Sequence, residues 1–272
     1  MISAYLMGGL GNQLFQIFAT MAYALEHNIS FTFFSFTTDR FNRYWNTFLL
    51  GLKKNTVQVD NRLSIYKEKG FHFKMIPKNI KQSFKLYGYF QSEKYFKNEF
   101  HNITHIIQLE KHQKNIIQKY KNYFKTTIIS LHFRIGDYAQ IQDCHPLMPL
   151  TYYKKSLQKI MNEIGHQFHV LYFCQQKDND IVKKKIKVLK QSYPEITFIK
   201  ASDDIVDWEQ MLLMSCCKHR IIANSTFSWW GAYFNNSTEK IVCYPDTWFG
   251  PKLSFHNTND LCPDEWNKIP IF

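Results

Sequence analysis

The second half of the chain alternates between short apolar runs and segments in which apolar residues recur at helical spacing. Runs typical of buried strands occupy residues 127–133, 169–174, 196–199, 220–223 and 240–244. Helical spacing is found over residues 152–164, 180–191 and 208–216, and again from residue 227 onward. Strand and helix alternating with this regularity predict a parallel, doubly wound sheet.

The first half is less regular. Residues 2–6 are apolar enough for a short buried strand, and Leu14, Phe18, Met21 and Leu25 then recur at helical spacing. A further helix is expected over residues 106–123, and the stretch from Asp246 to the C-terminus is expected to wind over the surface. We therefore expect two α/β domains, residues 1–126 and 127–272, with the boundary near 121–126.

A glycine-rich loop lies between the first strand and the first helix. Gly8, Gly9 and Gly11 allow positive φ and leave room for a ligand, and Asn12 can cap the helix that follows. Amides at such a helix start favour a phosphate or a sugar. The alternative is an ordinary tight turn, because the loop matches neither the P-loop nor the dinucleotide-binding pattern.

Two other predicted strands also end in polar residues. The strand at 127–133 leads into His132, Arg134 and Asp137, and the strand at 220–223 is followed by a hydroxyl-rich segment, Asn224 to Ser228. Open α/β sheets bind ligands at the ends of such strands. Each segment can also be explained by structure alone: Arg134 and Asp137 can form an ion pair, and Trp229 and Trp230 can belong to the hydrophobic core. Three such junctions in one chain favour a nucleotide-sugar site.

Composition narrows the class of protein. Hydrophobic residues make up 45% of the 272 residues, which excludes disorder, and no apolar run of about 18 residues predicts an integral membrane segment. No signal peptide precedes the first strand, so a cytoplasmic location is expected. The six cysteines show no C-x-x-C spacing and the 11 histidines no H-E-x-x-H array, so no metal site is predicted. The net charge of +12 suits anionic partners, although Lys183 to Lys185 fit a solvated helix face.

The chain resembles the glycosyltransferase family that contains the α-1,2-fucosyltransferases. The resemblance rests on Gly8–Gln13, Gly88–Phe96, His132–Tyr138 and Ile221–Gly231. It implies a GT-B-like fold of two Rossmann-like α/β domains facing a cleft. It also implies inverting transfer of fucose from GDP-fucose to the 2-hydroxyl of a galactose-type acceptor on a glycan, with no cofactor and no metal. The first domain would then hold the acceptor and part of the donor site, and the second the GDP-sugar.

The resemblance also implies roles for individual residues. Arg134 would bind the diphosphate through its guanidinium fork, and His132 would contact guanine or ribose unless it is a buried structural histidine. Ile135 stands where the family usually has a second arginine, and Gln210 where it often has an aspartate, so the acid that meets guanine stays open between Asp207 and Glu209. The expected donor site comprises Gly11, Asn12, Gln13, His132, Arg134, Asp207, Glu209, Asn224, Ser225, Thr226 and Ser228.

The general base is left open at this point. Asp143 and Asp137 are both close to the Arg134 strand in sequence, and Asp137 is as well suited to orienting Arg134. A reaction with an oxocarbenium-like transition state can also proceed without a strong base. Two other classes of function remain: a non-catalytic module that binds sugar nucleotides or glycans, and a basic RNA-binding protein that stacks bases on its 24 Phe and 16 Tyr. No RNP-type motif supports the RNA-binding class, so no nucleic-acid partner is expected. The acceptor glycan and the oligomeric state do not follow from the sequence.

Overall fold

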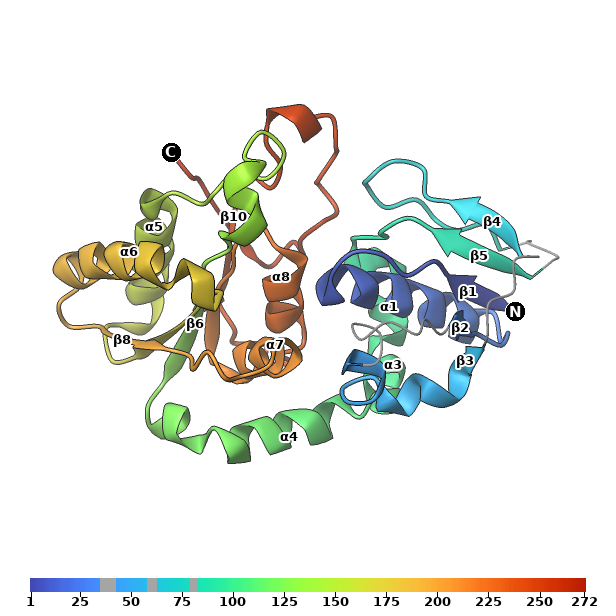
Figure 1. The fold of residues 1–272 in the computed structure, drawn as a ribbon, viewed down its shortest axis with the longest axis horizontal. Coiled ribbons are helices and arrows are strands. Elements are labelled where there is room, and N and C mark those ends of the chain that lie inside the picture. The colour runs from blue at the N-terminus through green and yellow to red at the C-terminus, as the bar shows by residue number, and fades with distance from the viewer. Residues whose placement is uncertain (35–42, 58–62, 79–82) are drawn as a thin grey trace. The chain divides into compact units, whose positions relative to one another are not determined.

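The computed structural model describes residues 1–34, 43–57, 63–78 and 83–272. These residues form two compact units (Figure 1). Unit 1 contains residues 1–112 and 256–263, and unit 2 contains residues 113–255 and 264–272. Each unit is an α/β structure with its own parallel sheet.

Unit 1 is built on a three-stranded parallel sheet in the order β1-β5-β4. These strands are β1 (Ile2–Ala4), β4 (Ser64–Lys67) and β5 (Phe84–Tyr87), and a separate pair joins β2 (Phe33–Phe34) to β3 (Thr56–Val57). Helix α1 (Leu10–Glu26) follows β1 and is buried over most of its length, because it is apolar on nearly all sides. The unit also contains α3 (Phe100–Ile106) and three 3₁₀ turns, η1 (Leu50–Asn55), η2 (Glu93–Tyr95) and η3 (Lys97–Glu99).

The helix expected over residues 106–123 is two helices, α3 and α4 (Leu109–Lys119), followed by the 3₁₀ turn η4 (Lys121–Lys125). The break falls at Gln108, whose φ of +55° does not fit a right-handed helix. Within unit 2, the side chain of Gln113 donates to Ser215 Oγ at 2.9 Å and to the Phe234 carbonyl at 3.0 Å. These bonds attach the end of α4 to unit 2, so the units divide between His112 and Gln113 rather than at residues 121–126.

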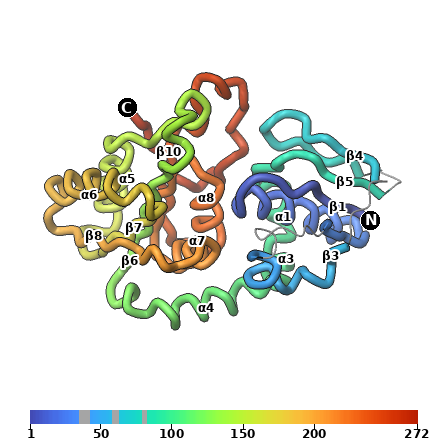
Figure 2. Tube along the Cα trace, viewed as in Figure 1, coloured from blue at the N-terminus to red at the C-terminus, as the bar shows by residue number. Residues whose placement is uncertain are grey.

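Unit 2 contains six parallel strands in the order β11-β10-β9-β6-β7-β8. Figure 2 traces the chain through this unit, from green at β6 to red near the C-terminus. The strands are β6 (Ile128–His132), β7 (His169–Phe173), β8 (Thr197–Lys200), β9 (His219–Ile221), β10 (Val242–Pro245) and β11 (Asn267–Ile269). The helices are α5 (Leu150–Ile164), α6 (Asn179–Ser192), α7 (Asp207–Cys216) and α8 (Thr226–Tyr233), with short 3₁₀ turns η5 (Gly136–Gln140), η6 (Gln176–Asp178) and η7 (Pro251–Leu253). Figure 1 shows α5 and α6 on one side of this sheet and α7 and α8 on the other.

The predicted parallel, doubly wound sheet is confirmed for unit 2. The chain runs from β6 outward to β7 and β8, and then returns to β9 on the other side of β6. Strand β11 was not expected, because the C-terminal stretch reads as a surface segment. It adds to the edge of the sheet, with Lys268 opposite Tyr244, and its Ile269 is buried in the core of the unit.

Arg220 is fully buried in the middle of unit 2, on β9. Its guanidinium donates to the carbonyls of Met214 at 3.3 Å and Ser215 at 2.6 Å, and also to those of Cys217 and Lys218. These carbonyls lie at or just beyond the C-terminal end of α7, where they lack the amide four residues on that a continuing helix would supply. Burial lowers the pKa of Arg220 to about 10, so the group remains a cation at neutral pH.

No helix among the described residues is long and apolar enough to cross a bilayer.

We predict that Arg220→Lys destabilises the protein by about 3 kcal/mol, because one ammonium cannot reach carbonyls on both sides of the α7 terminus and some stay buried without a donor. Urea unfolding followed by circular dichroism measures this free energy. Lys190→Arg, an exchange of the same two residue types at an exposed position of α6, should change it by less than about 0.5 kcal/mol. A loss no larger than that of this control would contradict the capping role.

Candidate functional site

The carboxyl ends of β6 and β9 are neighbours in the sheet of unit 2, at the point where the strand order reverses. The pairing places Leu131 of β6 opposite Ile221 of β9. Ligands of open α/β sheets bind outside the strand ends at such a switch point. The segments that follow these two strands are the two polar motifs of the sequence, His132–Tyr138 and Asn224–Ser228. The topology therefore brings both motifs to one place, which we call the switch-point site.

His132 is the last residue of β6 and is 8% exposed. Its Nδ1 is buried without a hydrogen-bond partner among the described residues, and its ring centroid lies 5.7 Å from that of Phe227, in the first turn of α8. Burial, and to a smaller extent the charge of Arg134, lower the pKa of His132 to about 3. The imidazole is therefore neutral, and one of its nitrogens is left for a ligand to satisfy.

Arg134 is held at the same strand end by two neighbours from its own loop. Its guanidinium pairs with Asp137 and lies 4.7 Å from the centroid of the Tyr138 ring. The side chain is 23% exposed, and a guanidinium has five N–H donors, so the ion pair with Asp137 leaves donors available. The ion pair and the ligand-binding reading of Arg134 are thus compatible.

Ile135 explains the departure from the family pattern. It is 5% exposed and packs in the hydrophobic core of unit 2, so the position that usually carries a second arginine here serves packing. The next residue, Gly136, has a φ of +40° and donates its amide to Oδ2 of Asp178 at 2.9 Å. Asp178 is buried, and sequence reasoning missed it. The one available signal was an acidic residue two positions before the helix predicted over residues 180–191.

Asn224 joins three loops around the switch point. It is fully buried, and its Nδ2 donates to the carbonyls of Pro146 at 3.0 Å and Trp248 at 3.1 Å. Its own carbonyl accepts the Tyr138 hydroxyl at 3.3 Å. Asn224 Oδ1 is buried without a partner among the described residues. The side chain expected to touch the donor therefore also sets the shape of the site.

The residues with hydroxyl groups that follow β9 differ in the hydrogen bonds that these groups already make. Ser225 is the N-cap residue of α8, and its side chain makes no capping bond, so it leaves the first-turn amides of the helix uncapped by that hydroxyl. Thr226 is the first residue of the helix. Ser228 is buried and its hydroxyl donates within the turn, to Ser225 O at 3.3 Å. Trp229 and Trp230 are fully buried, which confirms the reading of this pair as core.

The loop that carries Asp143 is packed against residues that follow β10. Gly250 donates its amide to the Cys144 carbonyl at 2.8 Å, and a Cβ at this glycine would lie 2.4 Å from the Asp143 carbonyl oxygen. His145 stacks on Tyr138 with the ring centroids 4.6 Å apart. The loop thus belongs to the switch-point site, although the Asp143 carboxylate is exposed and lies 3.1 Å from Lys252 Nζ.

Asp207 and Glu209 lie at the start of α7. Asp207 Oδ1 accepts the amide of Trp208 at 2.8 Å. Glu209 is 9% exposed and accepts both Lys119 Nζ, at 2.8 Å, and the hydroxyl of Tyr120. Glu209 therefore fastens α4 to α7 inside unit 2, and its oxygens are already used for that purpose.

The glycine loop of unit 1 is held by carboxamides. Helix α1 begins at Leu10 with Gly9 as its N-cap, so the expectation that Asn12 caps this helix is wrong: Asn12 lies inside the first turn, as does the buried Gly11. Instead, Asn12 Oδ1 accepts Gln91 Nε2 at 3.1 Å, while Gln13 Nε2 donates to the Gly8 carbonyl at 3.1 Å. The loop therefore meets the second unit 1 motif, which contains Gln91.

Gly8 has the positive φ expected of it, +78°, and a Cβ there would lie 2.5 Å from Asn12 Nδ2. Gln16, one turn further along α1, was not among the predicted residues. It exchanges two hydrogen bonds with the backbone of Met7, at 2.9 and 3.1 Å, and so fixes the entry of the loop.

A third group at the strand ends of unit 1 was missed by sequence reasoning. Glu68 follows β4, and its two carboxylate oxygens accept the amides of Tyr89 at 2.7 Å and Phe90 at 2.9 Å. A Cβ at Gly88 would lie 2.3 Å from Glu68 Cβ, so glycine is required for this approach. Phe90 has a φ of +53°, which is strained for a bulky residue. Burial raises the pKa of Glu68 to about 7.

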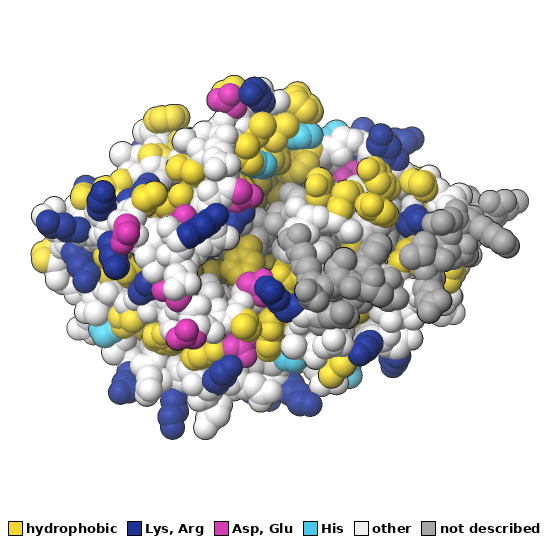
Figure 3. All heavy atoms as spheres, viewed as in Figure 1, with side chains coloured by type: hydrophobic (Ala, Val, Ile, Leu, Met, Phe, Trp, Pro, Cys, Tyr) yellow, Lys and Arg dark blue, Asp and Glu magenta, His cyan; other side chains and the backbone are white. Residues whose placement is uncertain are grey.

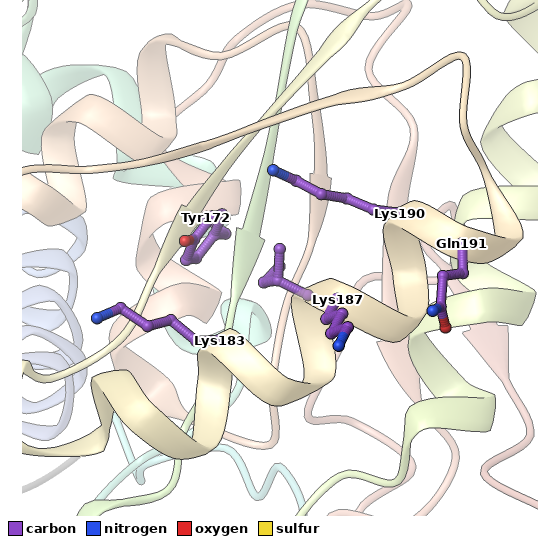
Figure 4. A pocket seen from close by; sticks show the side chains of 6 residues that line it. Tyr172, Lys183, Lys187, Lys190 and Gln191 are labelled. Atoms are coloured by element: carbon purple, nitrogen blue, oxygen red, sulfur yellow. The ribbon is translucent and has the colours of Figure 1, made fainter.

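Basic side chains are dispersed on the face that Figure 3 shows. Lys and Arg are scattered over this face and interleaved with acidic and apolar groups. A hollow of about 500 Å³ beside α6 is lined by Tyr172, Lys183, Ile186, Lys187, Lys190 and Gln191. In Figure 4 the ammonium groups of Lys183 and Lys190 lie on either side of the Tyr172 ring. None of these residues belongs to the switch-point site.

Known proteins that are similar to this chain include two glycosyltransferases that match nearly its whole length. The chain is 29% identical over 297 residues to an alpha-1,2-colitosyltransferase of Escherichia coli, with 98% of each chain covered. It is 26% identical over 306 residues to the O-antigen biosynthesis glycosyltransferase WbnK of the same organism, with 96% of this chain and 98% of the relative covered.

A solved structure supports the fold. A mutant of Arabidopsis thaliana FUT1 in complex with GDP matches 96% of this chain and 74% of its own, with a TM-score of 0.50 and 12% identity. The expected GT-B-like class of two Rossmann-like α/β domains is confirmed. The model of glycosyl transferase family 11 matches residues 58–270. The parallel sheets, the switch-point motifs and this match together show that the chain belongs to glycosyl transferase family 11.

Proposed function

We propose that the protein transfers fucose from GDP-fucose to the 2-hydroxyl of a galactose unit in a glycan, with inversion at the anomeric carbon. Membership of family 11 supports sugar transfer from a nucleotide donor. The observation that carries the proposal is the meeting of Arg134, His132 and the start of α8 at the switch point of unit 2. This is where a doubly wound sheet binds a nucleotide.

Charge stabilisation of the leaving GDP is the first chemical requirement. As the bond to the sugar breaks, negative charge grows on the diphosphate, and fixed donors aimed at that charge lower the barrier. Arg134 offers a guanidinium fork that fits phosphate oxygens, and Asp137 and Tyr138 hold it in place. The first-turn amides of α8, with the hydroxyls of Ser225 and Thr226, add neutral donors.

Recognition of the nucleoside is assigned to residues around the same strand end. His132 is neutral and has a buried ring nitrogen without a partner, which suits a hydrogen bond to ribose or guanine. The acid that meets guanine is assigned to the start of α7, at Asp207 or Glu209, where Asp207 accepts the amide of Trp208 and Glu209 accepts Lys119 and Tyr120. The acceptor side is assigned to unit 1, and Asn12 and Gln13, in the first turn of α1, are assigned to the part of the donor site that this unit supplies.

A second donor is favoured by one observation, the 29% identity to an alpha-1,2-colitosyltransferase. Colitose is fucose without its 3-hydroxyl, so both donors share the same GDP and differ by one polar group. A site that hydrogen-bonds that hydroxyl rejects the deoxy sugar strongly, whereas an apolar site discriminates weakly. The sugar donor is therefore decided by one contact.

Incubating the purified protein with GDP-fucose, GDP-colitose or GDP-mannose and a set of β-galactosides tests this function. Mass spectrometry and linkage analysis should find fucose on the galactose 2-hydroxyl. If the protein transfers sugar only from GDP-colitose, the proposed donor is wrong but the proposed class of reaction still holds. Binding of GDP without turnover would indicate a non-catalytic binding module. Binding of RNA with steep salt dependence, and no binding of GDP, would indicate an RNA-binding protein.

We predict that transfer needs no divalent cation, because Arg134 and the α8 amides supply the charge at the diphosphate. Activity measured after treatment with EDTA should stay within about twofold of the untreated value. Activity that disappears on chelation and returns with Mn²⁺ would assign the diphosphate to a metal instead.

Arg134→Lys should lower kcat by about 100-fold, because a point charge cannot reproduce the bidentate contact of the guanidinium with the diphosphate. Steady-state kinetics with the preferred donor measure this change, and thermal unfolding checks that the fold is intact. Arg43→Lys, at an exposed arginine of unit 1, provides the matched control and should leave kcat unchanged. A near-normal kcat for Arg134→Lys would remove this residue from the site.

A further inference from the structure

Proton transfer is the part of the reaction that the switch-point site leaves unassigned. The two carboxylates expected from the sequence both lie in unit 2, and each already pairs with a cation. Asp137 holds Arg134, and Asp143 lies exposed beside Lys252. A group that takes a proton from the acceptor must be placed where the acceptor binds. The strand ends of unit 1 are the place to search, if that unit receives the acceptor as proposed.

Three loops meet at the carboxyl edge of the unit 1 sheet. β5 pairs in parallel with both β1 and β4, so the segments that follow these strands emerge at the same edge. The segment after β1 contains Asn12, which bonds to Gln91 from the segment after β5. That same segment donates its Tyr89 and Phe90 amides to Glu68, after β4. Glu68 is therefore part of the same hydrogen-bonded cluster as the glycine loop.

Glu68 is held firmly and keeps capacity to accept a proton. Each carboxylate oxygen accepts one backbone amide, and each has a further lone pair. The side chain is half-buried, and it forms no ion pair with the residues that the structure describes. Among the described residues, Glu68 is coupled to Tyr66 on β4 and Tyr95 on η2, whose pKa values are raised and which are uncharged near neutral pH. A carboxylate in such surroundings is not neutralised by a cation.

Local strain also points to function at this place. Phe90 is 1% exposed and has a left-handed backbone conformation. Its own amide is bound by Glu68, and the next residue is Gln91. Strained residues of this kind persist only where their surroundings fix them, and they cluster at active sites. The close approach of Glu68 to Gly88 is the contact that fixes this turn.

We propose that Glu68 is the general base that accepts the proton of the acceptor hydroxyl. The hydroxyl oxygen forms the new bond to the anomeric carbon of the donor sugar, and its proton moves to Glu68. The bond from that carbon to the diphosphate oxygen breaks, and its electron pair leaves with GDP. This role rests on the proposed function. A base whose pKa lies near 7 is half-ionised at neutral pH and transfers protons efficiently there.

Glu68→Gln tests the assignment, because the amide keeps an acceptor oxygen for the turn but cannot take the proton. We expect kcat to fall about 100-fold at pH 8, with the KM for the GDP-sugar within threefold of the wild-type value. Wild-type kcat should rise with pH through about 7, and this limb should vanish in Glu68→Gln. Glu68→Asp should restore a titrating limb at a lower kcat.

Asp260→Asn is the matched control. Asp260 is also a carboxylate of unit 1 that accepts a backbone amide, that of Phe73 at 3.1 Å, and it pairs with Lys94. Its replacement should leave kcat and the pH profile unchanged. If Glu68→Gln keeps kcat within threefold of the wild-type value, or keeps the wild-type pH limb, Glu68 is not the base. If Glu68→Gln does not fold, Glu68→Asp provides the test instead. A kcat for Glu68→Asp equal to that of the wild type would overturn the proposal.

The results distinguish a failure of the proposed function from a failure of the Glu68 assignment. A wild-type protein that transfers from no GDP-sugar refutes the proposed function, and the assignment of Glu68 fails with it. An active wild type with an active Glu68→Gln refutes the assignment alone. A second readout is independent of activity: because its pKa is raised, Glu68 contributes stability that is lost as pH rises from about 4.5 to 7, so the difference in unfolding free energy between the wild type and Glu68→Gln should change over this range. Equal pH dependence of the two proteins would also overturn the proposal.

Discussion

The parallel pairing of β6 with β9 is the constraint on which the rest of the donor side depends. In this register Leu131 faces Ile221, so β6, which ends at His132, and β9, which ends at Ile221, finish side by side and the two polar loops diverge from one edge. A slip of one residue would turn every side chain to the opposite face of the sheet. Arg220 fixes where β9 begins, because its guanidinium ties the strand to the backbone carbonyls at the end of α7.

Buried polar side chains, rather than regular structure, shape the loops of both units. Asn224, Asp178, Gln16 and Glu68 each bind backbone groups of a loop that lies elsewhere in the chain. A buried amide or carbonyl without a partner is costly, so each of these side chains selects one loop conformation. Catalysis by fixed dipoles needs such preorganisation, because groups that must reorient at the moment of reaction contribute little.

The sequence predicted the sheet of unit 2 and the identity of its polar strand ends, because β-branched runs and helical spacing are local signals. It did not predict β11, the break at Gln108 or the division inside α4, since each is decided by contacts made far along the chain. The cap of α1 was misassigned by three residues, because Gly9 and Asn12 are both acceptable capping residues and only packing distinguishes them. Glu68 carried no recognisable signal and Asp178 only a weak one, because their partners are backbone amides, which nearly every residue type has.

Inverting transfer places opposite electrostatic demands on the two sides of the reaction. The departing diphosphate needs a cation and amide dipoles, whereas a base needs surroundings that let its carboxyl hold a proton near neutral pH. A guanidinium beside a carboxylate favours its ionised form and weakens it as a base. Unit 2 presents Arg134 and the start of α8, which the Ser225 side chain does not cap, and unit 1 presents Glu68, which among the described residues is coupled to the uncharged Tyr66 and Tyr95. Building the two groups on separate sheets allows each to keep the environment that its chemistry requires.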